Sequence, residues 1–103
     1  MQLLTKELRR RLPALGSTDG QAEALAVVKF FTPDSSWTWY AVEFDGEDTF
    51  YGLVDGLELE FGYFSLRELM SVRGHLGLPI ERDRWFTPQP IQQLYEELRT
   101  ARY

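Results

Sequence analysis

The middle of the chain alternates between apolar runs and clusters of turn residues. Four runs rich in aromatic and β-branched side chains lie at residues 25–32, 37–44, 49–54 and 57–64. The turns between them are Pro33–Ser36, Asp45–Asp48 and the pair Asp55-Gly56, which is typical of a two-residue hairpin loop. We therefore predict a four-stranded antiparallel β-meander.

Helical signals flank this region on both sides. Thr5 can cap a short helix that has a leucine at every fourth position. Ser65 opens a capping box with a glutamate three residues later, which predicts a helix from about 66 to 73. A last helix is predicted from near Pro90, where apolar side chains recur at helical spacing. We expect one α+β domain over residues 1–103, with a short N-terminal helix and two C-terminal helices packed on the sheet.

The turn lengths fix a strand register that sorts the side chains onto two faces of the sheet. We predict that Phe44 pairs with Thr49 and that Val54 pairs with Leu57. One face is then the core face, and it collects Ala26, Val28, Phe30, Trp37, Trp39, Ala41, Phe50, Val54, Leu57, Leu59 and Phe61.

The opposite face combines apolar side chains with charges. It collects Leu25, Val27, Lys29, Phe31, Tyr40, Val42, Phe44, Tyr51, Leu53, Glu58 and Glu60. Tyrosines beside aliphatic side chains, with a charged rim, are typical of a recognition surface. The predicted binding residues, for a protein partner or a second copy of the chain, are Tyr40, Phe44, Tyr51, Glu58 and Glu60. The competing interpretation is that the last helix or the Trp85-Phe86 connector covers this face within the same chain.

Composition excludes several kinds of chemistry. The 103 residues include no cysteine, so a disulfide, a thiolate zinc site and a cysteine nucleophile are excluded. No apolar run reaches the roughly 18–20 residues of a membrane helix, and residues 1–11 are charged where a signal peptide is apolar. His75 is the only histidine, and the glycines match no nucleotide-binding loop. We expect a cytoplasmic protein with no membrane contact and no cofactor.

The net charge of −5 is unevenly distributed along the chain. It is +3 over residues 1–12, −9 over 13–64 and +1 over 65–103. A central acidic field repels phosphate groups, and aromatic sheets that bind RNA lie in a basic surround. Direct nucleic-acid binding is therefore not expected.

The second predicted turn carries the densest group of carboxylates. Glu43, Asp45, Glu47 and Asp48 lie within six residues, and hard divalent cations are bound by carboxylate oxygens. A metal site formed by Glu43, Asp45 and Asp48 would suit a metal-dependent phosphodiesterase or nuclease. The spacing differs from an EF-hand, however, and no basic residue stands beside the acids to orient a phosphate. Turn formation explains the aspartates without a ligand, and Glu43, on the core face, is expected to pair with an arginine, Arg67, Arg73 or Arg82.

Several segments together resemble a known family. They are Leu3–Leu8, Val28–Phe31 with Pro33-Asp34, Trp37–Tyr40, Glu43–Asp48, Phe50–Val54, Gly62–Leu66 and Gly77–Asp83. In combination they resemble the bacterial family called domain of unknown function 2958, over most of the chain.

The resemblance implies a small bacterial protein of the kind found on mobile elements and sometimes fused to DNA-processing domains. It implies no activity and no catalytic residues. We therefore expect a non-catalytic protein-binding or accessory module of a mobile-element or DNA-processing system. The alternative is the metal-dependent phosphodiesterase or nuclease.

Overall fold

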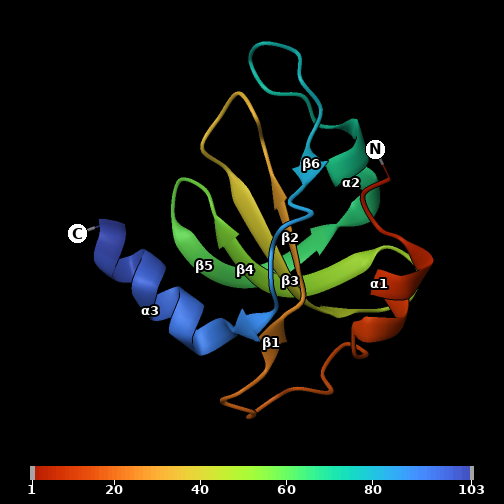
Figure 1. Ribbon diagram of the computed structural model, residues 1–103, viewed down its shortest axis with the longest axis vertical. Helices are drawn as coiled ribbons and strands as arrows, with labels where there is room; N and C mark the ends of the chain where they lie inside the picture. Colours follow the sequence, from red (N-terminus) through yellow and green to blue (C-terminus); the bar gives the residue numbers. More distant parts are fainter. Residues whose placement is uncertain (1, 103) are drawn as a thin grey trace.

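The apolar runs in the middle of the chain form most of one antiparallel sheet. The computed structural model describes residues 2–102, and its main sheet contains β2 (Val28–Phe31), β3 (Thr38–Phe44), β4 (Thr49–Asp55), β5 (Leu59–Ser65) and β6 (Glu81–Arg82). The strand order is β5-β4-β3-β2-β6, and every neighbouring pair is antiparallel (Figure 1). The predicted meander is therefore present, with one further strand at its edge.

The described residues form three helices beside the sheet, so the fold is α+β: α1 (Lys6–Arg11), α2 (Leu66–Ser71) and α3 (Ile91–Arg102). The predicted caps are confirmed, since the Thr5 hydroxyl accepts from the Leu8 amide and the Ser65 hydroxyl from the Glu68 amide. No helix within residues 2–102 has the length and apolar character to cross a bilayer.

The first predicted strand is divided in two. β1 (Leu25–Ala26) leaves the main sheet and pairs with β7 (Gln89–Pro90), forming a separate two-stranded sheet. This pairing brings the start of α3 beside β1, where the Ile91 amide donates to the Ala24 carbonyl. The fifth strand of the main sheet, β6, was missed because it has two residues and lies in a connector rich in charges.

The predicted two-residue hairpin after β4 is wrong. Val54 pairs with Glu60, and Asp55 pairs with Leu59, so the loop contains three residues, 56–58. The Gly56 amide donates to the Glu58 carbonyl inside this loop at 3.0 Å. Leu57 is thereby removed from the core face and becomes 86% exposed.

The register between β3 and β4 also differs from the prediction. Ala41 pairs with Gly52, but Glu43 pairs with Tyr51, so Val42 is the extra residue of a β-bulge. A bulge shifts the following residues by one position, which reverses their faces. Phe44 consequently joins the core beside Phe50, and the predicted placement of Glu43 and Phe44 is wrong.

Both faces of the sheet are covered by apolar contacts. The N-terminal segment, α1 and α2 cover the face that holds Trp39, and α3 covers the opposite face (Figure 1). The first core contains Leu3, Leu4, Leu12, Val28, Phe30, Trp39, Ala41, Phe44, Phe50, Leu66, Leu69 and Ile80. The second contains Ala24, Ala26, Tyr40, Val42, Leu53, Ile91 and Leu94. The two C-terminal helices therefore pack on different faces.

Candidate functional site

The five predicted binding residues do not share one open surface. Tyr40 and Phe44 are buried in different cores, Tyr51 is half-buried, and only Glu58 and Glu60 are exposed. The bulge moves Phe44 to the other face, and α3 with Phe86 covers Tyr40, whose ring centroid lies 5.9 Å from that of Phe86. The competing interpretation, in which the chain itself covers this face, is therefore correct for Tyr40. A partner cannot reach Tyr40 or Phe44.

Glu43 is buried, and its partners are backbone groups and a hydroxyl instead of an arginine. One carboxylate oxygen accepts from the Gly16 amide at 2.7 Å, and the other accepts from the Thr18 amide at 3.0 Å and from the Thr18 hydroxyl. Burial alone raises the pKa of Glu43, but these hydrogen bonds together lower it below its ordinary value. Glu43 thus fastens the loop that follows α1 onto β3, and the predicted arginine pair is wrong.

Asp45 and Asp48 are also occupied by hydrogen bonds from the chain. One Asp45 oxygen accepts from the amides of Glu47, Asp48 and Thr49, which closes the turn. The Asp48 carboxylate accepts from the Ser65 hydroxyl at 2.6 Å and from the Arg67 amide at 2.8 Å, which joins the turn to the start of α2.

These hydrogen bonds stabilise the ionised forms, so the pKa values of Asp45 and Asp48 are lowered. Within residues 2–102, no group of three histidine, cysteine or carboxylate residues has a geometry that could hold a metal ion. The described geometry therefore gives Asp45 and Asp48 structural roles and offers no observation in favour of the nuclease alternative.

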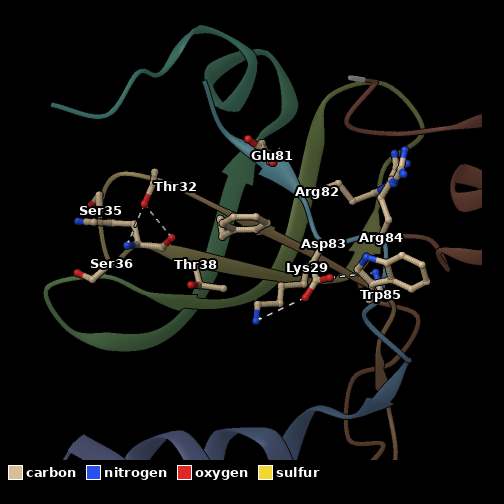
Figure 2. A pocket seen from close by; sticks show the side chains of 12 residues that line it. Lys29, Thr32, Ser35, Ser36, Thr38, Glu81, Arg82, Asp83, Arg84 and Trp85 are labelled. Atoms are coloured by element: carbon tan, nitrogen blue, oxygen red, sulfur yellow. Dashed lines mark hydrogen bonds and ion pairs between the residues drawn. The ribbon is translucent and has the colours of Figure 1, made fainter. Parts of the chain in front are cut away.

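A groove of about 650 Å³ lies on the half of the second face that α3 leaves open. Figure 2 shows the groove running from Ser35 and Ser36 in the β2–β3 turn, past Thr38, to Asp83 and Trp85. We call it the Trp85 groove; its full lining is Lys29, Phe31, Thr32, Ser35, Ser36, Trp37, Thr38, Glu81, Arg82, Asp83, Arg84 and Trp85.

Hydrogen bonds to β2 hold the Trp85 wall in place. The Asp83 amide donates to the Lys29 carbonyl at 2.9 Å, and the Lys29 ammonium lies 3.8 Å from the Asp83 carboxylate. The other Asp83 oxygen accepts from the Trp85 amide at 2.9 Å (Figure 2). This turn leaves the Trp85 side chain 89% exposed.

A second exposed feature adjoins the β2–β3 turn. Residues 70–78, the last two residues of α2 and the loop that follows, carry four of the nine large apolar side chains that are exposed within residues 2–102, and we call this segment the apolar loop. These four are Met70, Val72, Leu76 and Leu78. Figure 1 shows that the chain between α2 and β6 projects beyond the sheet.

The backbone of the apolar loop is fixed although its side chains are exposed. The Asp34 carboxylate, from the β2–β3 turn, accepts from the Leu76 amide at 2.8 Å and from the Leu78 amide at 3.4 Å. The Gly74 amide donates to the Leu78 carbonyl, and the Gly77 amide donates to the Gly74 carbonyl, both at 2.9 Å. Gly77 has a φ of 83°, which favours glycine.

Sequence reasoning missed both features. It interpreted Asp34 as a turn residue and residues 75–86 as an extended connector, because the bond between Asp34 and Leu76 spans 42 positions. A detectable signal was the presence of two leucines, Leu76 and Leu78, in a stretch that glycine and proline otherwise mark as a solvated loop.

The chemistry available at this end of the sheet is that of binding. The lining of the Trp85 groove offers hydroxyl groups, an exposed indole ring and charges of both signs. His75, the single histidine, lies exposed in the apolar loop, away from the carboxylates of the Asp45 turn.

A family model matches residues 3–102, nearly the whole chain. The chain belongs to the family described as protein of unknown function (DUF2958). The resemblance seen in the sequence is thereby confirmed, and the description of DUF2958 assigns no activity. No curated protein and no solved structure matches the chain.

Proposed function

We propose that this DUF2958 protein is a non-catalytic binding module that holds a protein partner with the apolar loop and the adjoining Trp85 groove. The observation that carries the proposal is the fixed backbone of a loop that exposes four large apolar side chains. Large apolar side chains exposed together on one short segment are a feature of interaction sites.

The rigidity of the apolar loop favours association. A loop that is already ordered loses little conformational freedom on binding, so less of the interaction energy is spent on ordering it. Leu76 is 73% exposed and Met70 is 60% exposed, so both have apolar surface left to bury. Full burial of such a side chain stabilises a complex by about 1.5–3 kcal/mol.

The Trp85 groove supplies the polar part of the proposed site. Tryptophan is among the residues that most often dominate binding energy at protein interfaces, and Trp85 stands exposed at the groove wall. The three cations of the groove are nearly balanced by the carboxylates of Glu81 and Asp83, so the groove is not the strongly basic surface that binds a phosphate backbone. We therefore propose a protein, and not a nucleic acid, as the partner.

An accessory role in a mobile-element or DNA-processing system is part of the proposal. It rests on the family resemblance alone.

Two exposed leucines permit a matched experiment. A photo-crosslinking amino acid is placed at Leu76 in one sample and at Leu57, in the loop after β4, in the other. After irradiation in extracts of the source cells, we expect a protein to be crosslinked to the sample that carries the probe at position 76. The same protein should not be crosslinked to the sample that carries the probe at position 57. The crosslinked protein is then purified, and its dissociation constant is measured by calorimetry.

The proposal expects that Leu76→Glu weakens binding of the purified partner at least about tenfold, while Leu57→Glu leaves it within about twofold. Asp34→Ala, which removes the acceptor for the Leu76 amide, should weaken binding with no change in the contacting side chains. Equal binding by wild-type protein, Leu76→Glu and Leu57→Glu would refute the proposed site.

A further inference from the structure

The two edges of the main sheet differ in how well they are protected against strand addition. β6 has two residues, both charged, and charged residues follow it. β5 has seven residues and contains no proline, no lysine and a single charge, Glu60. Short length, charges, proline, bulges and cover by a helix are the usual protections of an edge strand. Of these, β5 has a single charge and the packing of Tyr95 of α3 on the ring of Phe61.

The backbone groups on the open side of β5 can be assigned from two hydrogen bonds. The Leu66 amide donates to the Asp48 carbonyl at 2.8 Å, and the Gly56 amide donates to the Glu58 carbonyl at 3.0 Å. Hydrogen-bonded pairs alternate along an antiparallel ladder, so the even-numbered residues of β5 bond to β4. The groups that point away from the sheet are the N–H and C=O of Leu59, Phe61 and Tyr63 and the N–H of Ser65, whose carbonyl caps the start of α2.

We propose that two copies of the chain associate through β5, in an antiparallel pair whose two-fold axis passes Gly62. In this register Phe61 lies opposite Tyr63 of the second copy, and Leu59 lies opposite Ser65 of the second copy. Phe61 and Tyr63 of each strand then donate one hydrogen bond and accept one, and the Ser65 amide donates to the Leu59 carbonyl of the second copy. A second copy is the occupant that we propose, because this register satisfies the outward groups at the centre of both strands at once.

Gly62 gives independent support for a neighbouring backbone at this point. Its counterpart in β4, Gly52, is required within the chain, since a Cβ there would lie 1.9 Å from the Tyr40 carbonyl oxygen. A Cβ on Gly62 would meet no atom within 4 Å, so nothing within the described chain requires a glycine there. In the proposed pair, Gly62 faces Gly62 of the second copy in a non-hydrogen-bonded position, where the Cα atoms approach most closely.

The side chains are also compatible with this pairing. Tyr63 is 69% exposed, and pairing would place its ring beside Phe61 of the second copy on the same face of the sheet. Aromatic cross-strand pairs of this kind stabilise antiparallel strands. Glu60 would lie opposite Phe64 of the second copy, and the strand pair contains no other charged side chain. The pairing therefore places no like charges opposite one another.

Association is tested by sedimentation velocity of the full chain from about 1 to 500 μM, because one strand pair is a small interface with an affinity expected near the micromolar range. Tyr63→Pro removes an N–H that points away from β4, and proline is tolerated at such edge positions. We expect it to weaken association at least about tenfold with an unchanged circular dichroism spectrum. Tyr63→Thr, which keeps the N–H, should weaken it less. If Tyr63→Pro does not fold, Tyr63→Lys provides the same edge test.

Amide exchange identifies the interface directly. The amides of Phe61 and Tyr63 should become protected as the protein concentration rises, while those of Gly62 and Phe64 should be protected at every concentration. A chain that stays monomeric throughout the range would overturn the inference. So would a dimer that Leu76→Glu dissociates and Tyr63→Pro does not, since such a dimer would use the apolar loop.

Discussion

The Glu43 carboxylate accepts a hydrogen bond from the Thr18 amide at 3.0 Å, across 25 positions of the chain. Together with its companion from the Gly16 amide and the bond from the Phe44 amide to the Pro13 carbonyl, this contact attaches the loop after α1 to the end of β3. A carboxylate in the interior is stable only where it has such partners.

Replacing Glu43 with glutamine tests this attachment. Glutamine has one acceptor oxygen where the carboxylate has two, so its NH₂ group would face donors from Gly16 or Thr18. We expect Glu43→Gln to lower the free energy of unfolding by about 2 kcal/mol, measured by urea denaturation. The matched control is Glu47→Gln in the exposed turn, which should change stability by less than about 0.5 kcal/mol. Equal midpoints for both variants would contradict the structural role of Glu43.

The stability of the protein should fall in acid partly because of Glu43. Its ionised form is held more tightly in the folded state than in the unfolded chain, where the ordinary pKa is 4.5. The contribution is therefore complete above about pH 4.5 and is lost as the pH falls through the lower folded-state pKa. Urea denaturation at pH 7, 5, 4 and 3 should show a smaller acid loss in Glu43→Gln than in the wild type. A parallel decline in both proteins would argue against this linkage.

Tyr40 should behave in the opposite sense at high pH. Burial, with smaller contributions from the charges of Asp55 and Asp83, raises the pKa of Tyr40 from 10.0 to about 12. Its contribution to stability is therefore complete below about pH 10 and is lost as the pH rises through 12. In a stopped-flow pH jump followed by tyrosinate absorbance, Tyr40→Phe should remove the tyrosine that ionises last. If the last phase of the absorbance change persists in the Tyr40→Phe variant, another residue produces it.

The facing glycines of β4 and β5 offer a matched pair for a test of packing. A Cβ at Gly52 would lie 1.9 Å from the Tyr40 carbonyl oxygen, a backbone atom that cannot move without disturbing β3. We expect Gly52→Ala to cost about 3 kcal/mol of unfolding free energy. Gly62→Ala, placed in open space, should leave stability unchanged or raise it by up to about 1 kcal/mol. Both are measured by denaturation at low protein concentration, and similar losses for the two variants would contradict the assignment.

The elements whose signals are local could be predicted from the sequence. The caps at Thr5 and Ser65 depend on neighbouring residues, and both are present. The Asp45 turn likewise closes on amides within four positions. Such contacts form between residues that are adjacent in any conformation of the chain, so residue type alone specifies them.

The bulge in β3 could not be predicted, for a physical reason. Every residue from Trp39 to Phe44 is buried, because the strand has a core on each face. A strand buried on both sides loses the alternation of polar and apolar residues that reveals register. The faces of Glu43 and Phe44 were consequently reversed in the prediction, and the predicted recognition surface depended on them.

The apolar loop shows a second reason why part of the structure could not be predicted from the sequence. Its conformation depends on the Asp34 carboxylate, which lies in the β2–β3 turn, 42 positions from Leu76 in the sequence. Propensities of the loop residues contain no information about that partner. The exposed leucines were visible in the sequence, but their rigid presentation was not.

The contrast between a seven-residue edge and a two-residue edge also limits how far an assembly can grow. The proposed pair of β5 strands uses the same surface on both subunits and leaves the two short β6 strands as the outer edges of the joined main sheet. Repeated strand addition, the route to fibres, would need a second open edge to continue. The shortness of β6 therefore disfavours growth of the joined sheet beyond the two chains of the proposed pair.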